Sequence, residues 1–260
     1  MALSFSLRLN TLLRSFGLLL LCLSGAGSLA AEPLRVAMSP DYKPLAFMLD
    51  GKRVGIEVDN AKEVGKYLGR PIEIVVLKQS DYIAALNDGR ADVIMSGYSV
   101  TPEREAQVSF ADSFMQIGQM AIIVADKAAR YAHPRALYQP GVRIAVEPGT
   151  TGDAFARDAF QQAQILNYPD PSYAFAALRA GAADIFIHDA PTSWALASSR
   201  EDQDLMSLYR PLTSENLAWA VRKGNTVLQG QLNAALEHLR ANGRLRAIQN
   251  YWIPLTVQVR

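Results

Sequence analysis

Short apolar runs alternate along the chain with longer segments in which hydrophobic side chains recur at helical spacing. The apolar runs are rich in Val, Ile and Leu, which is typical of buried strands. The longer segments gather their hydrophobic side chains on one face, as amphipathic helices do. This alternation predicts an α/β protein with largely parallel sheets. The predicted strands are 34–38, 72–77, 91–95, 120–125, 143–146 and 217–221, and the clearest predicted helices are 58–68, 228–240 and 245–252.

The N-terminal thirty residues follow a different pattern and are expected to lie outside the fold. Arg8 and Arg14 precede an apolar run over 16–23, and small neutral residues follow as far as Ala30. This order is typical of a secretory signal peptide, and Ser-Leu-Ala at 28–30 fits its cleavage site. The apolar run is too short for a stable membrane anchor. We therefore expect a cleaved signal peptide over 1–30 and a periplasmic mature chain.

Cysteine content and charge narrow the class of protein. The single cysteine, Cys22, lies inside the apolar run behind two leucines, where a lipidation signal would need small residues. The mature chain then needs no disulfide, since about 230 residues can bury an adequate core. The formal net charge is +1 for the whole chain and −1 without Arg8 and Arg14. So small a charge argues against a nucleic-acid partner.

A ten-residue pattern occurs twice, over 85–94 and 177–186. In each copy a predicted helix ends at a glycine, which is a common helix C-cap, and a buried strand follows. The strands then lead into polar loops at 96–99 and 188–192. We therefore predict two similar α/β units that present polar loops from equivalent strand ends, although helix–glycine–strand units also recur in unrelated α/β proteins.

The stretch 96–104 is the first candidate for ligand chemistry. It leads from the predicted strand over 91–95 through a glycine-containing loop to a helix start, where Thr101 can cap and Pro102 fits the first helical position. The free N–H groups and the dipole of a helix start suit an anion. Arg104 adds a guanidinium fork that matches a carboxylate. A capped surface helix with a solvated Arg104 is the competing interpretation.

A comparable loop follows the predicted strand over 143–146. Residues 147–153 include Gly149, Thr150 and Thr151 and precede a predicted helix over 154–163. This loop can also offer N–H groups and hydroxyls to an anion. Turn chemistry of this kind is common, so the loop carries weight only in combination with the first one.

A larger set of motifs extends over nearly all of the mature chain, about 34–252. The motifs are Tyr42-x-Pro44, Gly55-x-x-x-Asp59, Ala85-Leu86-x-x-Gly89-x-Ala91-Asp92, Thr101-Pro102-Glu103-Arg104, Phe110-Ala111-Asp112, Gly149-Thr150-Thr151, Ala183-Asp184-x-x-x-His188-Asp189, and Asn242-Gly243 ahead of Tyr251-Trp252. Each motif alone is common, but the set is specific. It resembles the periplasmic solute-binding proteins of polar amino-acid ABC transporters, solute-binding family 3.

This resemblance implies an α/β, two-lobe periplasmic-binding-protein fold of type II. Each lobe would contain a mixed β-sheet flanked by helices, with lobe 1 formed by 32–118 plus 218–260 and lobe 2 by 119–217. Two crossover strands, near 117–120 and 217–220, would form the hinge. Hinge closure would trap a small-molecule ligand, an amino acid or related carboxylate, between the lobes. The resemblance further implies a monomer that delivers its ligand to the membrane permease of an ABC transporter, without cofactor or metal.

The resemblance also implies the residues that bind the carboxylate of an amino acid. Arg104, Ser99 and the backbone of Gly97 would hold it from lobe 1. Thr151, with Thr150 beside it, would complete this clamp from lobe 2.

The rest of the ligand would be held by four further residues. Asp189 would pair with the α-ammonium, because a cationic group needs an acidic partner. Tyr42 would pack on the ligand side chain or offer it a cation–π face. Gln79 falls where many members place a stacking aromatic, and His188 falls where glutamine-type members contact the ligand side chain.

Three positions depart from the family pattern. Ser39 stands where many members have an acidic residue, Gln79 is not aromatic, and Glu147 stands where glutamine-type members have a lysine. An acidic residue at 147 would repel an acidic ligand and favour a cationic or amide side chain. Aspartate and glutamate are therefore the less favoured ligands.

Each of the singled-out side chains also has a purely structural interpretation. Asp189 could cap a helix that begins before Pro191. His188 could be a hydrogen-bonded loop histidine, and Tyr42 could pack between the lobes. Glu147 could face solvent at the rim of the cleft.

Two other functions fit the same scaffold. Exported cyclohexadienyl (arogenate/prephenate) dehydratases resemble this family closely and would use an acid in the cleft to protonate a leaving hydroxyl. Glu147, Asp153 and Asp189 are the loop acids available for that role. A periplasmic ligand sensor that signals through a separate membrane partner is the other alternative. The sequence contains no metal-ligand cluster and no nucleophilic Ser/His/Asp signature, so we expect a binding protein and not an enzyme.

Overall fold

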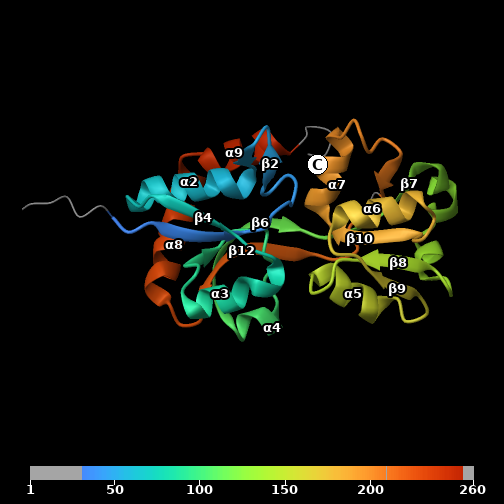
Figure 1. The fold of residues 1–260 in the computed structure, drawn as a ribbon, viewed down its shortest axis with the longest axis horizontal. Coiled ribbons are helices and arrows are strands. Elements are labelled where there is room, and N and C mark those ends of the chain that lie inside the picture. Colours follow the sequence, from blue (N-terminus) through green and yellow to red (C-terminus); the bar gives the residue numbers. More distant parts are fainter. Residues whose placement is uncertain (1–30, 209, 254–260) are drawn as a thin grey trace, which may run out of the picture. The chain divides into compact units, whose positions relative to one another are not determined.

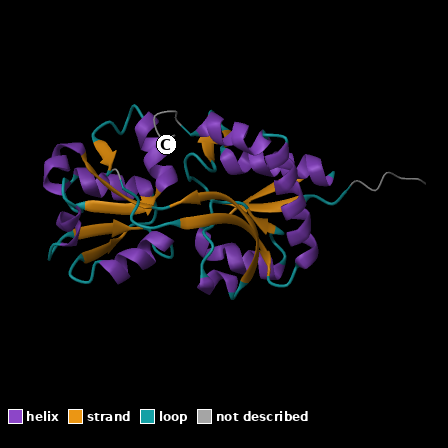
Figure 2. Ribbon diagram, turned by 180° about the vertical axis from the view of Figure 1, so that it is seen from behind, coloured by secondary structure: helices purple, strands orange, loops and turns teal. Residues whose placement is uncertain are grey.

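The computed structural model describes residues 31–208 and 210–253. The predicted signal peptide over 1–30 lies outside the described residues. Within the described part, two five-stranded sheets and one two-stranded sheet account for the strands, and helices flank both larger sheets (Figures 1 and 2). The α/β fold with mixed sheets that the family resemblance implied is therefore confirmed. The largely parallel sheets predicted from the alternation of strands and helices are wrong, because β12 and β7 each pair antiparallel with both of their neighbours. No helix of the described residues is long and apolar enough to cross a membrane.

The first sheet is mixed and has the strand order β4-β1-β5-β12-β6. Strand β1 lies between β4 and β5 and is parallel to both, whereas β12 is antiparallel to β5 and to β6. The strands are β1 (Leu34–Met38), β4 (Ile72–Val76), β5 (Val93–Ile94), β6 (Val108–Ile117) and β12 (Glu215–Arg222).

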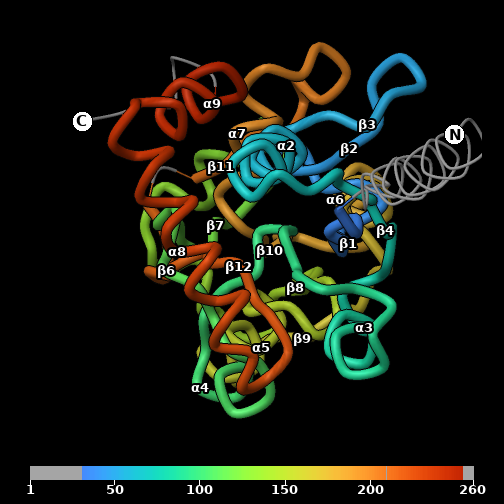
Figure 3. The backbone as a smooth tube through the Cα atoms, turned by 90° about the vertical axis from the view of Figure 1, so that its left-hand side faces the viewer, coloured from blue at the N-terminus to red at the C-terminus, as the bar shows by residue number. Residues whose placement is uncertain are grey.

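Helices cover both faces of the first sheet. Alternate side chains of a strand point to opposite faces, so Val36 and Met38 pack with one hydrophobic cluster while Ala37 packs with another. The first cluster includes α2 (Ile56–Leu68), α8 (Thr226–Ala241) and α9 (Arg244–Trp252), and the second includes α3 (Tyr82–Asp88). In Figure 1, α2 and α9 lie above the strands and α3 lies below them. Figure 3 shows α8 beside β6 and β12, which it contacts.

The second sheet has the order β11-β7-β10-β8-β9 and is also mixed. Its strands are β7 (Gln119–Val124), β8 (Arg143–Val146), β9 (Gln164–Asn167), β10 (Ile185–Asp189) and β11 (Leu205–Ser207). The helix α5 (Thr151–Ala159) packs on one face together with the 3₁₀ segments η2 (Ala125–Tyr131) and η3 (Pro134–Tyr138). On the other face lie α6 (Pro171–Arg179) and α7 (Ala190–Ser198).

The repeated sequence pattern has a structural counterpart in each sheet. Arg35 on β1 donates its backbone N–H at 2.9 Å and two guanidinium nitrogens to Asp92, and its third nitrogen donates to the carbonyl of Gly89. Arg143 on β8 donates in the same way to Asp184, with its backbone N–H at 3.0 Å, and to the carbonyl of Gly181. The two sheets therefore contain the same arginine–aspartate arrangement, in which a strand is tied to the loop that follows the helix-ending glycine.

The chain passes from the first sheet to the second at Gly118 and returns between β11 and β12. The two crossings are hydrogen-bonded to each other, since Gln119 donates its N–H to the Thr213 hydroxyl at 2.9 Å and Leu212 donates to the Gln119 carbonyl at 2.7 Å. An added Cβ at Gly118 would lie 2.9 Å from the Pro211 side chain, which accounts for a glycine at this crossing. The lobe boundaries at 118/119 and 217/218 remain a prediction.

Most predicted elements are present, with corrections at several places. The strands over 34–38 and 143–146 match in full, whereas the helix predicted over 154–163 begins at Thr151, because Thr150 caps it, and ends at Ala159. The polar stretch over 127–139 forms the 3₁₀ segments η2 and η3. The remaining short elements are β2 (Phe47–Leu49), β3 (Lys52–Val54), η1 (Gln79–Asp81) and α4 (Pro102–Glu105).

Candidate ligand-binding site

The loop after β5 holds Arg104 in the way its sequence suggests. Thr101 caps the short helix α4 by accepting the N–H of Arg104 at 3.3 Å, and Pro102 occupies the first turn. The Arg104 guanidinium lies 4.1 Å from the ring centroid of Tyr98 and donates to the Ser99 carbonyl at 2.9 Å. Its other terminal nitrogen lies 3.4 Å from the carbonyl of Gly149, which belongs to the loop after β8. Arg104 therefore connects the loops of the two sheets.

Gly97 is held by a buried acid. Its N–H donates to Glu57 Oε1 at 2.9 Å, and its φ of +60° is a conformation that favours glycine. An added Cβ would lie 2.9 Å from Tyr42 Cε1 and would clash with Leu45. The amide of Gly97 could reach a ligand carboxylate only after leaving Glu57, so its predicted part in the clamp depends on that bond.

Glu57 itself is fully buried on α2. Besides Gly97, it accepts the Trp219 indole N–H at 3.0 Å, and the Asn60 side-chain nitrogen lies 3.5 Å away. Burial raises the pKa of Glu57 from 4.5 to about 7, and its hydrogen bonds oppose this shift without cancelling it. A carboxyl group that changes charge near neutral pH therefore lies directly behind the loop that carries Gly97.

The loop after β8 uses its two threonines differently. The Thr150 hydroxyl accepts the N–H of Asp153 at 3.1 Å and donates to the Glu147 carbonyl at 2.8 Å, so it caps α5. The Thr151 hydroxyl accepts from Gln119 Nε2 at 3.0 Å. Gln79 reaches the same loop and donates to the Gly149 carbonyl at 2.8 Å. Arg104 and Gln79 therefore converge on one backbone oxygen of the second sheet.

Asp189 ends β10 and precedes α7, but its side chain does not cap that helix. Its carboxylate accepts the hydroxyl of Tyr42 and the side-chain nitrogen of Gln119. Both bonds link parts of the chain that are distant in sequence. Burial, followed by the charge of Asp189, raises the pKa of Tyr42 well above its ordinary value. Asp189 therefore occupies the N-cap position of α7, as the structural interpretation suggested, but its carboxylate is directed toward Tyr42 and Gln119 and makes no capping bond.

His188 lies next to this carboxylate and contacts a second one. Its Nε2 is 3.2 Å from Glu147 Oε2, its Nδ1 is 2.8 Å from the Thr192 hydroxyl, and its ring meets Tyr42 edge to face at 5.7 Å. Burial alone would lower the pKa of His188, but the hydrogen bond with Glu147 and the charge of Asp189 raise it above 6.5. A protonated His188 would partly compensate the negative charge of both neighbours.

Two residues of this network were not identified from the sequence. Gln119, at the start of β7, is fully buried, and its Nε2 contacts Asp189, Thr151 and, at 3.0 Å, Glu215 Oε1. Glu215 opens β12 and accepts the Thr213 hydroxyl at 2.7 Å. Each lies at the edge of an apolar run and has partners tens of residues away, so no local pattern marked either one.

The predicted site residues therefore fall into two groups. Arg104, Ser99, Gln79 and the loop of Gly149 form a cationic group at one place, and Tyr42, His188 and Asp189 form an acidic group at the other. Ser99 is buried, and its contact with Arg104 is through its carbonyl. A guanidinium in one group and a carboxylate in the other are the charges that would complement a molecule carrying both charges.

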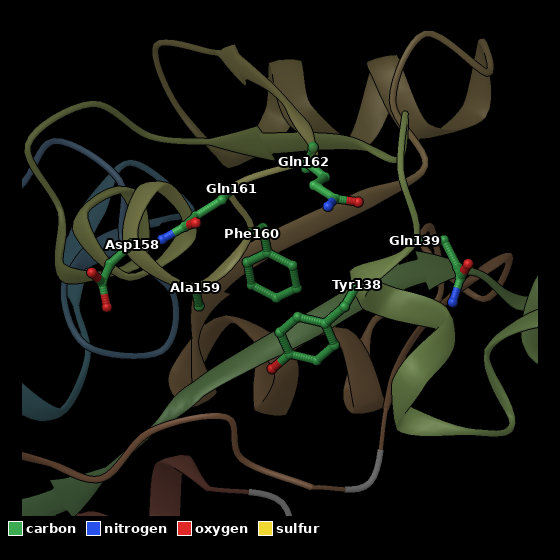
Figure 4. A pocket seen from close by; sticks show the side chains of 8 residues that line it. Tyr138, Gln139, Asp158, Ala159, Phe160, Gln161 and Gln162 are labelled. Atoms are coloured by element: carbon green, nitrogen blue, oxygen red, sulfur yellow. The ribbon is translucent and has the colours of Figure 1, made fainter.

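Among the described residues no group of three or more His, Cys, Asp or Glu is placed to hold a metal ion. A hollow elsewhere, on the second sheet's helices, is lined by Tyr138, Phe160 and polar neighbours, with the two rings stacked at 4.5 Å (Figure 4). It contains none of the predicted site residues.

The fold is that of the two-lobe α/β binding proteins, as the solved structures confirm. The structure of an ancestral amino acid-binding protein, AncCDT-1, described as a precursor of cyclohexadienyl dehydratase, matches with a TM-score of 0.79 and 31% identity over 85% of this chain and 96% of that one. The family model of bacterial extracellular solute-binding proteins, family 3, matches residues 34–255. The chain belongs to this family.

Two curated relatives show how far the likeness extends. The cyclohexadienyl dehydratase of Pseudomonas aeruginosa is 34% identical over 158 residues, which are 60% of this chain and 59% of that protein. The ABC transporter arginine-binding protein 1 of Escherichia coli is 26% identical over 88% of this chain and 93% of that protein. The dehydratase is thus the more similar in sequence over a shorter region, whereas the binding protein matches over nearly its full length.

Proposed function

We propose that this protein captures a small polar amino acid between its two lobes and delivers it to the permease of an ABC transporter. The observations that support this most directly are the contact of Arg104 with the loop after β8 and the contacts of Asp189 with Tyr42 and Gln119. The guanidinium of Arg104 would take the α-carboxylate in a charge-assisted clamp, and Asp189 would take the α-ammonium. Thr151 is tied to the same network through Gln119 and would complete the clamp.

Hinge closure is the second part of the proposal. Tyr42 contacts Asp189, and Gln79 and Arg104 contact the Gly149 carbonyl, so bonds already run between the first sheet and the second. A ligand held by Arg104 on one side and by Asp189 on the other would add further contacts between the two sheets. Its binding free energy would then favour closure, which is the state that a permease would recognise.

Export is the third part. The family consists of extracellular solute-binding proteins. Cleavage after Ala30 would release the mature chain into the periplasm, where a permease could receive the ligand. N-terminal sequencing of the protein recovered from the periplasm tests this, and a start at or near Ala31 is expected.

Binding is tested by titration calorimetry of the mature protein with the standard amino acids. We expect at least one amino acid to bind and to be recovered unchanged. Arg104→Ala should weaken the binding free energy of this amino acid by about 2–5 kcal/mol. Arg90→Ala is the matched control, because Arg90 is an exposed arginine that pairs with Asp88 outside the site. Undiminished binding by Arg104→Ala would refute the proposed site.

A dehydratase activity is the second candidate, favoured by the 34% identity to the Pseudomonas aeruginosa enzyme. Glu147 contacts His188, Asp189 follows it in the chain, and both could act as acids, whereas Asp153 pairs with Arg157 at 2.7 Å on its own helix. Incubation with arogenate and prephenate, followed by chromatography, distinguishes the two functions. Loss of either compound, accompanied by an aromatic product, would establish the enzyme.

A further inference from the structure

The acidic group of the candidate site contains more negative charge than an amino acid's α-ammonium can compensate. In addition to burial, the charges of three carboxylates raise the pKa of Tyr42, namely those of Asp189, Glu147 and Glu215. Of these, Asp189 would pair with the ligand ammonium under the proposed function, and Glu147 contacts His188 at 3.2 Å. Glu215 has no cationic partner among the ion pairs of the described residues, so its charge is left to be explained.

The contacts of Glu215 show that half of its carboxylate is unused. Oε1 accepts the Thr213 hydroxyl at 2.7 Å and Gln119 Nε2 at 3.0 Å. Oε2 is buried and receives no hydrogen bond within the described part of the chain. A buried carboxylate oxygen without a donor is unfavourable, because it has lost water and gained nothing in exchange.

Gln119 provides a second and independent sign of an incomplete site. Its side chain is fully buried, its Nε2 donates to Asp189 and to Glu215, and its Oε1 has no hydrogen-bond partner among the residues that the structure describes. Two carboxylates from different strands therefore converge on a single neutral nitrogen. A neutral amide can offer hydrogen bonds to these carboxylates, but it cannot offset two negative charges.

We propose that Glu215 is a ligand-binding residue that selects amino acids with a positively charged side chain. The inference rests on the proposed function and names the substrate class of the same site. Arg104 would hold the α-carboxylate and Asp189 the α-ammonium, which leaves Glu215 to accept from a guanidinium or a second ammonium. Such a group would supply both the missing donor and the missing charge.

The opposite class of ligand is disfavoured by the same geometry. An acidic side chain would face Glu215 and Glu147 as like charges, and a neutral side chain would leave Glu215 uncompensated. The test therefore compares two ligands of nearly the same shape that differ in charge. L-arginine and L-citrulline are such a pair, since citrulline replaces the guanidinium with a neutral urea group.

The experiment is titration calorimetry of wild type and Glu215→Gln with both ligands. We expect wild type to prefer arginine, and Glu215→Gln to reduce the ratio of the two affinities by about tenfold or more while citrulline binding changes little. Glu215→Asp keeps the charge and should retain most of the preference, which guards against a variant that only misfolds. Glu201→Gln, at an exposed acid outside the site, is the matched control.

Three outcomes overturn the inference. Equal weakening of arginine and citrulline would show that Glu215 only positions Gln119 and Asp189. Unchanged affinities for both arginine and citrulline would show that Glu215 does not contact the ligand. If wild type binds glutamine or another neutral amino acid but not arginine, lysine or ornithine, the proposed function stands and the assignment of the substrate class fails. If wild type binds no amino acid at all, the proposed function itself fails.

Discussion

The carboxylate of Glu57 accepts the backbone N–H of Gly97 at 2.9 Å, and both groups are buried. This bond joins the first turn of α2 to the loop after β5, which leads to Arg104. The donors around Glu57 are the N–H groups of Gly97, Trp219 and Asn60, all of which are neutral. The conformation of the loop is therefore linked to the protonation of one acid, and this link can be measured.

Replacing Glu57 with glutamine should make stability less dependent on pH. The native pKa of about 7 lies above the ordinary value of 4.5, so the native state holds the proton more tightly than the unfolded chain. Wild type should therefore lose stability as pH rises from about 4.5 to about 7, by about 3 kcal/mol in all. Urea denaturation across this range should show the loss in wild type and in Glu237→Gln, an exposed control, but not in Glu57→Gln. Parallel pH profiles for all three proteins would contradict the prediction.

Replacing Glu147 with glutamine should lower the pKa of His188. The hydrogen bond with Glu147 is the main favourable contribution that raises this pKa, and burial opposes it. NMR titration can follow His188 directly, because the chain has only three histidines. We expect the His188 ring to titrate above 6.5 in wild type and at a lower pH in the variant. His133 and His238 serve as internal controls, and a shift of equal size at all three rings would point to a general change in the protein instead.

Alanine at Gly97 should weaken both folding and ligand binding. The φ of +60° disfavours a side chain by about 1–2 kcal/mol, and the added Cβ would also press on Tyr42 and Leu45. Gly141→Ala separates the cost of the backbone conformation from the cost of crowding, since Gly141 has a φ of +75° with open space around it. Thermal unfolding should show a larger loss for Gly97→Ala than for Gly141→Ala. Equal losses would mean that the crowding against Tyr42 is relieved at no cost.

Removing the charge of Asp184 should destabilise the second sheet. Asp184 accepts three hydrogen bonds from Arg143, and these bonds hold the pKa of its carboxyl below the ordinary value. Asp184→Asn should cost about 2 kcal/mol at pH 7, and the difference from wild type should shrink as pH falls below about 4. Denaturation at pH 7 and pH 3 measures both effects. A difference that stays constant between these pH values would show that Asp184 contributes through packing and not through its charge.

The sequence predicts those features of the fold that local patterns determine. The run over 34–38 reads as a strand because four of its five residues are apolar, and Thr101-Pro102 predicts the start of α4 because a cap and a proline act within one turn. Strand β6 was not predicted, since Ser109, Asp112 and Gln116 interrupt its apolar pattern. Its position depends on pairing with β12, more than ninety residues later in the chain.

In the candidate site too, local patterns could be predicted and contacts between distant parts of the chain could not. Arg104 and Asp189 could be proposed from motifs, but the neighbours of Asp189 could not. Gln119 meets both Asp189 and Glu215 only because β7, β10 and β12 come together in three dimensions, with separations of 70 residues from Gln119 to Asp189 and 96 from Gln119 to Glu215. The bond from Gly97 to Glu57 was likewise not predicted, and it changes what the Gly97 amide can offer to a ligand.

The paired arginine–aspartate arrangements have a consequence for how the molecule can bend. Arg35 with Asp92 and Arg143 with Asp184 each tie residues within a single sheet, and neither pair joins one sheet to the other. Each pair therefore stabilises only its own sheet. A change in the angle between the two sheets would leave both pairs intact. It would instead strain bonds that run between the sheets, such as those from Tyr42 to Asp189 and from Gln79 to Gly149.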